Sequence, residues 1–168
     1  MHVLGVLTLL VALVPGQQPA PKPAAKPPAT APAPAAAAKP GAGRTVEITG
    51  GDDMKYNTTT INAKPGETLH VVLKSTGSIP KIAMAHNFVL LILGADVDGF
   101  LKSAMNARDT DYIPADQKAK VVASTKLAGP GETVEVTFKV PAKPGSYPYL
   151  CSFPGHYTAG MKGNLVVK

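Results

Sequence analysis

Alternating apolar and polar residues mark short strands along most of this chain. In residues 68–74 apolar side chains occupy every second position, and residues 133–140 alternate in the same way, with the valines and Phe138 on one face. A period of two is typical of strands that bury one face and leave the other in water. His70 falls on the polar face of its segment, so we expect it at the surface and outside any binding site.

Six further segments have the length and apolar content of strands, and turns rich in glycine and proline separate several of them. They are residues 45–49, 55–60, 60–63, 86–93, 146–151 and 163–167. Residues 98–107 instead carry apolar side chains at helical spacing, with Asp98 as the expected N-cap. Seven to eight strands at Greek-key-like spacing, with one short helical insertion, predict an all-β sandwich.

The first 43 residues differ in composition from the rest of the chain. Residues 3–14 are apolar except for Gly5 and Thr8, which predicts a signal peptide or a short apolar anchor over residues 1–16. Between Pro15 and Gly43 there are 9 prolines and 11 alanines. Such a segment has almost no large side chains to bury, so we expect residues 17–43 to be a disordered tether. Residues 44–168 then form one folded domain.

The charge of the chain excludes one class of function. The formal net charge is +6, but from Arg44 onward there are 14 basic and 11 acidic residues. The lysines are scattered singly, without the basic runs and interleaved aromatic residues that bind nucleic acid. We expect no nucleic-acid partner, and a mild preference for acidic protein surfaces.

The residues with the most specific chemistry lie near the C-terminus. The only cysteine, Cys151, is followed by His156 and Met161 within one short stretch. Thiolate, imidazole and thioether are soft donors that select copper, and a blue-copper site uses two histidines and a cysteine with a weak axial methionine. The second histidine must come from elsewhere, and His86 is the candidate. A bound metal also accounts for an unpaired cysteine in a chain that we expect to be exported.

Short motifs around these residues resemble the azurin branch of the cupredoxins, the blue copper proteins. The motifs are residues 84–90 (MAHNFVL), 111–112 (DY), 125–127 (TKL), 129–132 (GPGE), 137–138 (TF) and 151–156 (CSFPGH). Three features differ from azurins: four residues separate His156 from Met161 instead of three, no cysteines are available for the azurin disulfide, and Ala85 replaces a glycine. The Cys-x4-His-x4-Met spacing and the proline- and alanine-rich leader resemble the auracyanins.

This resemblance implies a cupredoxin sandwich that holds one type 1 copper ion per chain. The implied copper ligands are the ring nitrogens of His86 and His156, the thiolate of Cys151, the thioether of Met161 and, as a very weak contact, the backbone carbonyl of Ala85. Asn87 and Ser152 are expected to join the two ligand segments and to tune the thiolate through hydrogen bonds. Met54 and Met105 are expected to pack around the site.

The resemblance also implies a docking patch around an exposed edge of His156, through which electrons would pass. Its residues are Met84, Phe153, Pro154, Gly155 and Tyr157, with Ala85 beside them. The expected partners are exported redox proteins such as c-type cytochromes, or membrane electron-transfer complexes. We expect a monomer in the periplasm or another extracytoplasmic space, where the N-terminal segment can tether it to a membrane.

Two other classes of function are alternatives to electron transport. An enzyme such as a nitrite reductase or multicopper oxidase needs a second, catalytic copper site, and only His2 and His70 remain unassigned, so we expect no enzyme. A copper-handling protein, a chaperone or resistance factor, stays open as the alternative. Such sites are typically open and rich in methionine or cysteine clusters, whereas these donors are spread across one fold. The sequence therefore predicts a one-electron carrier cycling between Cu(II) and Cu(I).

Overall fold

The computed structural model describes residues 43–168. The expected signal or anchor segment and all but the last residue of the expected tether lie outside the described residues. Within residues 43–168, no helix has the length and apolar character needed to cross a membrane.

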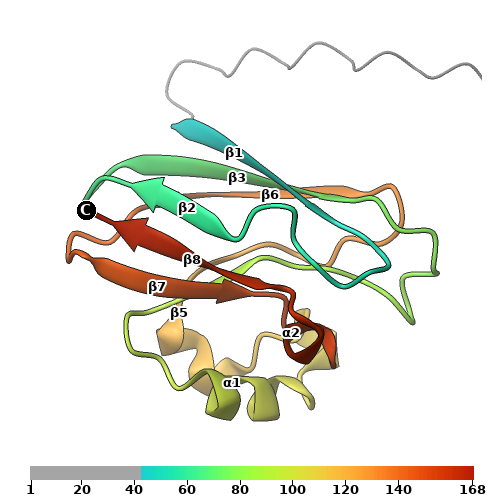
Figure 1. Cartoon of the computed structure of the whole chain (residues 1–168). Helices are drawn as coiled ribbons and strands as arrows, with labels where there is room; N and C mark the ends of the chain where they lie inside the picture. The colour runs from blue at the N-terminus through green and yellow to red at the C-terminus, as the bar shows by residue number, and fades with distance from the viewer. Residues whose placement is uncertain (1–42) are drawn as a thin grey trace, which may run out of the picture. The chain divides into compact units, whose positions relative to one another are not determined.

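Eight strands form two sheets that face each other, as the sequence predicts (Figure 1). One sheet has three strands in the order β1 (Arg44–Gly50), β3 (Thr68–Ser75) and β6 (Thr133–Lys139). The other has five, in the order β2 (Thr60–Ala63), β8 (Lys162–Val167), β7 (Gly145–Leu150), β4 (Val89–Leu91) and β5 (Val121–Ser124). The β1–β3 and β2–β8 pairs are parallel, and the other neighbouring strands are antiparallel.

The main core lies between the sheets and follows the predicted alternation. Leu69, Val71 and Leu73 of β3 are fully buried, while the apolar side chains of β6 are half-buried and pack against the same cluster. His70 lies on the other face, where its Nε2 atom is 3.0 Å from a carboxylate oxygen of Glu135. The expectation of a surface histidine outside the binding site is therefore confirmed.

Two predicted strands are shorter in the structure. Residues 55–60 contribute only Tyr56, in an isolated bridge to Gly50, before β2 begins. Residues 86–93 form a strand only over β4, because His86 leaves the sheet and bridges to Ala128. Strand β5, which the sequence did not reveal, is a four-residue edge strand next to β4.

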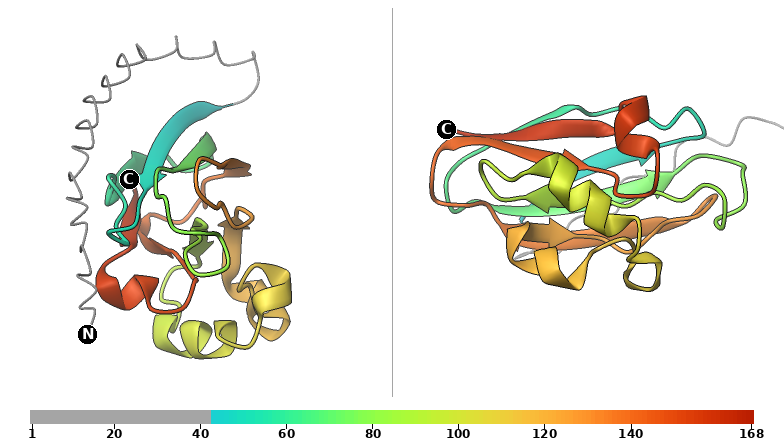
Figure 2. Two further views of the ribbon diagram at one scale, coloured as in Figure 1. Left: turned by 90° about the vertical axis from the view of Figure 1, so that its right-hand side faces the viewer. Right: turned by 90° about the horizontal axis from the view of Figure 1, so that it is seen from below.

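The helical insertion packs against the outer face of the five-stranded sheet (Figure 2). Helix α1 (Val97–Ala104) is capped by Asp96, whose carboxylate accepts a hydrogen bond from the backbone N–H of Gly99 at 3.0 Å. The expectation that Asp98 is the N-cap is therefore wrong, because Asp98 lies inside the first turn, where its charge favours the helix dipole. The sequence did not predict three short helical turns: η1 (Arg108–Thr110), η2 (Ala115–Lys120) and α2 (His156–Ala159).

Candidate metal centre

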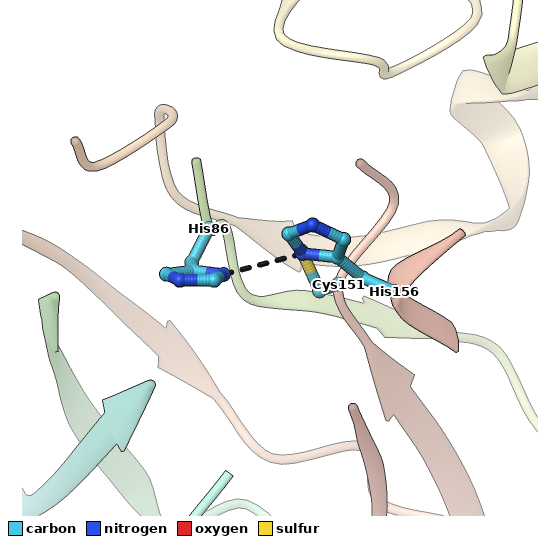
Figure 3. A group of neighbouring side chains, drawn as sticks. All are labelled: His86, Cys151 and His156. Atoms are coloured by element: carbon cyan, nitrogen blue, oxygen red, sulfur yellow. Dashed lines mark hydrogen bonds between the residues drawn. The ribbon is translucent and has the colours of Figure 1, made fainter. Parts of the chain in front are cut away.

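Three of the predicted donors meet at one end of the sandwich (Figure 3). The candidate donor atoms of His86, Cys151 and His156 all lie within 4.8 Å of one another. The Nδ1 atoms of the two histidines are 3.2 Å apart, and the Cys151 sulfur is 3.5 Å from Nδ1 of His156. His86 and Cys151 are fully buried and His156 is 2% exposed, so this cluster is shielded from water.

The loop between β7 and β8 brings Cys151, His156 and Met161 together. The backbone N–H of Cys151 donates to the carbonyl of Met161 at 3.1 Å, and the N–H of Met161 donates to the carbonyl of His156 at 2.9 Å. The loop reverses through Gly155 and Gly160, which flank α2 with φ angles of 85° and 110°, a conformation that favours glycine. These constraints explain how donors from one short segment can converge.

His86 reaches the cluster from a separate segment held by long-range backbone contacts. Its N–H donates to the carbonyl of Ala128 at 2.9 Å, and its own carbonyl accepts from the N–H of Ala128 at 2.7 Å. The preceding residue, Ala85, is fully buried, and its carbonyl oxygen lies 3.8 Å from the Cys151 sulfur. The structure therefore places the Ala85 carbonyl beside the Cys151 sulfur.

The side chain of Asn87 joins the two segments that carry the donors. Its Oδ1 atom accepts from the N–H of Ser152 at 2.9 Å, and its Nδ2 group donates to the Ser152 hydroxyl and to the carbonyl of Asp111, both at 2.8 Å. Asn87 is fully buried and Ser152 is 2% exposed, so these bonds do not compete with water. They fix the spacing between the residues next to His86 and Cys151.

Met161 is fully buried beside the cluster. Its methyl group rests against the backbone of Gly50 at the end of β1, and a side chain at that position would meet both this methyl group and the ring of His86. Met161 and His86 therefore lie over the same glycine. Sequence reasoning missed Gly50, because nothing near it in the chain indicates that it borders the donors.

Sequence reasoning also missed Tyr56, which supports the segment that carries His86. Its buried hydroxyl donates to the carbonyl of Asn87, and its ring lies 5.8 Å from that of Tyr149. Burial raises the pKa of Tyr56 well above its ordinary value, so this hydroxyl stays a donor. An isolated bridge to Gly50 also holds Tyr56 at this end of the sandwich.

Burial sets the protonation state of the donors. It raises the pKa of the Cys151 thiol to about 12, although the backbone N–H groups of Asn87 and Phe153 partly offset this by favouring the thiolate. Burial, followed by the charge of His86, lowers the pKa of His156 to about 4. The pKa of His86 is lowered by burial as well, against the attraction of nearby carboxylates. At neutral pH the cluster therefore holds two neutral imidazoles and one thiol.

These donors fit a soft metal ion. In the described part of the chain, Nε2 of His86 has no hydrogen-bond partner. The neutral ring can therefore carry its proton on Nε2, which leaves Nδ1 free to bind a metal. Two imidazole nitrogens and a sulfur then face one another, with a thioether beside them and no carboxylate in the cluster. Hard cations such as Mg²⁺ and Ca²⁺ need oxygen ligands, whereas copper suits imidazole and sulfur donors.

Comparison with known proteins identifies the family. A model of copper-binding proteins of the plastocyanin/azurin family matches residues 43–168. The chain belongs to this family. An azurin from Pseudomonas denitrificans is 42% identical over 128 residues, which cover 74% of this chain and 98% of that protein.

Two further proteins are similar to this chain. Outer membrane protein H.8 of Neisseria meningitidis serogroup B is 42% identical over 123 residues, 71% of this chain, and the match spans only 65% of that longer protein. The crystal structure of a reduced auracyanin from Roseiflexus castenholzii superposes with a TM-score of 0.66 at 37% identity, covering 76% of this chain and 99% of that one. Both resemblances seen in the motifs, to azurins and to auracyanins, are confirmed.

The surface around this plastocyanin/azurin-type site differs from the expectation in three ways. His156 is 2% exposed, so the expectation of an exposed imidazole edge is wrong. The ring of Phe153 covers it, with centroids 4.7 Å apart. Ala85 is fully buried and cannot belong to a docking patch, whereas Met105, expected to pack inside, is 65% exposed.

The other residues of the expected patch lie at or near the surface. Pro154 and Gly155 are exposed, and Phe153 and Tyr157 are half-buried. Met84 is half-buried as well, one residue before the fully buried Ala85. The loop that supplies three of the candidate donors therefore also supplies most of the surface above them.

Proposed function

We propose that this protein is a one-electron carrier with one copper ion per chain. His86, Cys151 and His156 would bind the ion through Nδ1, sulfur and Nδ1, with the Met161 thioether as a weak axial ligand and the Ala85 carbonyl as a still weaker contact. The observation that carries this proposal is a buried set of soft donors, held by backbone hydrogen bonds at the end of a β-sandwich. When bound, copper there supplies a reversible one-electron couple.

Residues around the site would hold the donors in the same positions in both oxidation states of the bound copper. Asn87 and Ser152 lock the two segments at a fixed separation, and Tyr56 holds the carbonyl of Asn87. The N–H groups that face the Cys151 sulfur favour its thiolate form. A site that moves little when its charge changes exchanges electrons with little rearrangement, which suits a carrier. A chaperone needs an open site that can give up its metal.

We infer that electrons enter and leave through the surface above His156. Phe153, Pro154, Gly155, Tyr157 and Met84 supply an apolar docking patch there, as exposed apolar residues often do at redox interfaces. The partners would be exported redox proteins, such as c-type cytochromes, or membrane complexes, and the carrier would act as a monomer without nucleic acid. No catalytic role is proposed.

We infer that the protein works outside the cytoplasm, in the periplasm or on a membrane surface. The apolar residues 1–16 would serve as an export signal or anchor, residues 17–43 as a tether, and residues 44–168 as the copper domain. Export also suits the single cysteine, which a bound metal would protect from oxidation.

The proposal is tested by copper titration of the reduced protein, followed by visible absorption, electron paramagnetic resonance and voltammetry. We expect an intense blue band that saturates at one copper per chain, with narrow hyperfine splitting and a reversible one-electron wave. A colourless complex, or uptake of several equivalents without a reversible wave, would overturn the proposal and favour the copper-handling alternative.

Binding of Cu(I) near pH 7 is expected to release one proton per chain. The Cys151 thiol, with a pKa of about 12, is protonated in the free protein, while His156, with a pKa of about 4, is already neutral. Because the thiolate is the form that binds metal, the apparent affinity for Cu(I) should rise about tenfold for each pH unit between pH 7 and 8, where both imidazoles are neutral. Calorimetry in buffers of different ionisation enthalpy measures the proton count, and a count of two would contradict a neutral pair of imidazoles.

Gly50→Ala is expected to displace the methyl group of Met161. The new Cβ would lie well inside van der Waals contact with that methyl group and about as close to the His86 ring as ordinary packing allows. We expect a shift of the visible bands of the copper-loaded protein and a loss of about 1 kcal/mol in the free energy of unfolding. Gly51→Ala is the matched control, because its Cβ would meet only polar side-chain atoms at 3.2 Å and 3.4 Å. Equal spectral shifts in both variants would contradict the role assigned to Gly50.

A further inference from the structure

Three lysines from different parts of the chain surround the loop that carries Cys151, His156 and Met161. The ammonium group of Lys55 donates to the carbonyl of Ala159 at 3.0 Å. That of Lys162 lies 4.3 Å from the centroid of the Tyr157 ring. Lys102, on α1, lines a shallow pocket together with residues of the same loop. We call Lys55, Lys102 and Lys162 the lysine ring.

None of the ring lysines forms an ion pair with the described residues. The four ion pairs in the described part of the chain involve other residues, and all three ring lysines are exposed. The carboxylates nearest to them along the chain are Asp53, two residues before Lys55, and Asp98, one helical turn before Lys102. Neither forms an ion pair with them, so the three ammonium groups stay exposed to solvent around one loop.

The pocket beside the ring is apolar and lies over the candidate metal centre. Its volume is about 150 Å³, and its walls include Leu101, Met105, Phe153, Pro154 and Tyr157. Met105 is 65% exposed, and the Phe153 ring packs against His156. A pocket of this size accepts one apolar side chain. A side chain in this pocket would be separated from His156 only by the ring of Phe153.

We propose that the electron-transfer partner of this protein is a protein that inserts an apolar side chain into this pocket and surrounds it with carboxylates that meet the lysine ring. The inference rests on the proposed function and names the chemistry of its partner. Redox encounters use small interfaces, so opposite charges around the contact control the rate of encounter more than the area does. An anionic membrane would be attracted to the ring as well, but the single-side-chain pocket favours a protein.

The chain offers a matched control for the ring. Lys64, Lys143 and Lys168 are exposed and lie where β2 and β8 end and β7 begins, at the far end of the sandwich (Figure 1). The length of β8, about 17 Å, separates that end from the loop. The variants Lys55→Gln/Lys102→Gln/Lys162→Gln and Lys64→Gln/Lys143→Gln/Lys168→Gln lose the same total charge. At 0.1 M salt the Debye length is about 10 Å, so only charges near the contact should affect the rate.

The test follows oxidation of the reduced, copper-loaded full-length protein at 0.1 M salt. One electron passes from the protein to the iron(III) of hexacyanoferrate, a trianion, or to cobalt(III) tris-phenanthroline, a trication, and reduces either metal to its divalent state. We expect the ring variant to react roughly tenfold more slowly with the trianion and faster with the trication. The control variant should change less than twofold. Equal effects in both variants would overturn the inference, because the response would then reflect net charge alone.

Two further measurements separate the inference from the proposed function and from the membrane alternative. Hexacyanochromate(III), an inert paramagnetic trianion, should broaden the amide signals of residues 153–160 more than those near Lys143, and the ring variant should lose this difference. This readout needs no electron transfer, whereas a wild-type protein that reacts with neither oxidant would contradict the proposed function instead. Co-sedimentation with phosphatidylglycerol vesicles at 0.1 M salt, if lost in the ring variant, would overturn the protein partner in favour of a lipid surface.

Discussion

Cys151→Ser is expected to abolish the blue absorption band and to weaken Cu(I) binding by about a thousandfold, or about 4 kcal/mol. The thiolate is the only anionic donor in the cluster, and the other donors there are neutral imidazoles and a thioether. A serine hydroxyl has nearly the same size, but it is a hard donor that does not lose its proton at neutral pH. The measurement is a competitive titration with a coloured Cu(I) chelator, combined with visible spectroscopy of the Cu(II) form.

The fold of the Cys151→Ser variant should be little changed, since serine fills nearly the same space in the buried loop. Circular dichroism and thermal unfolding of the metal-free protein check this. His70→Gln is the control for the loss of a potential donor, because His70 lies on the other face of β3, next to Glu135, and should leave the band intact. A Cys151→Ser protein with a full band at one copper per chain would contradict the ligand set proposed above.

Gly163→Ala is expected to destabilise the fold by about 3 kcal/mol. A Cβ at Gly163, in β8, would overlap the ring and hydroxyl of Tyr149 and the carbonyl of Thr59. Tyr149 cannot move aside easily, because it is fully buried and its hydroxyl donates to the carbonyl of Thr58 at 2.6 Å. For a domain of this size we expect the melting temperature to fall by about 10 °C. Thermal and urea-induced unfolding of the metal-free protein measure the loss.

The control for the clash is Gly66→Ala. Gly66 has a positive φ of 74°, but a Cβ there would meet no heavy atom within 4 Å. The Gly66→Ala substitution should lower the free energy of unfolding by about 1 kcal/mol, the strain of a left-handed backbone conformation for alanine. An equal loss of unfolding free energy in the two variants would mean that Tyr149 moves aside for the new methyl group, which would contradict the predicted clash. Because Tyr149 lies two residues before Cys151, a copper-loaded Gly163→Ala protein should also show whether strain in β7 reaches the site.

The sequence determined the chemistry of the site because that chemistry is local. Cys151, His156 and Met161 lie within eleven positions of one loop, so two glycines and two backbone hydrogen bonds between these residues are enough to bring their donors together. Soft donors select a soft metal whatever the rest of the fold does. His86 was within reach of sequence reasoning only because the site required one more histidine and the chain has few.

The alternation of apolar residues determined much of the fold, because it too is a local property of the sequence. A period of two in β3 and β6 decides which face is buried, and the structure follows it. The pattern does not say which strand is the neighbour of which. The parallel β1–β3 and β2–β8 pairs and the edge strand β5 depend on long-range pairing. So does the late start of β4, at Val89 instead of His86, which bridges to Ala128.

Only the tertiary structure decided what surrounds the donors. Gly50 borders Met161, Tyr56 holds Asn87, and Phe153 covers His156, and these contacts depend on how separate loops stack at one end of the sandwich. The hydrogen bond from Lys55 to Ala159 joins residues 104 positions apart. The physical reason is that side-chain type fixes what a residue can bind, whereas burial and charge are properties of the neighbours that folding brings to it.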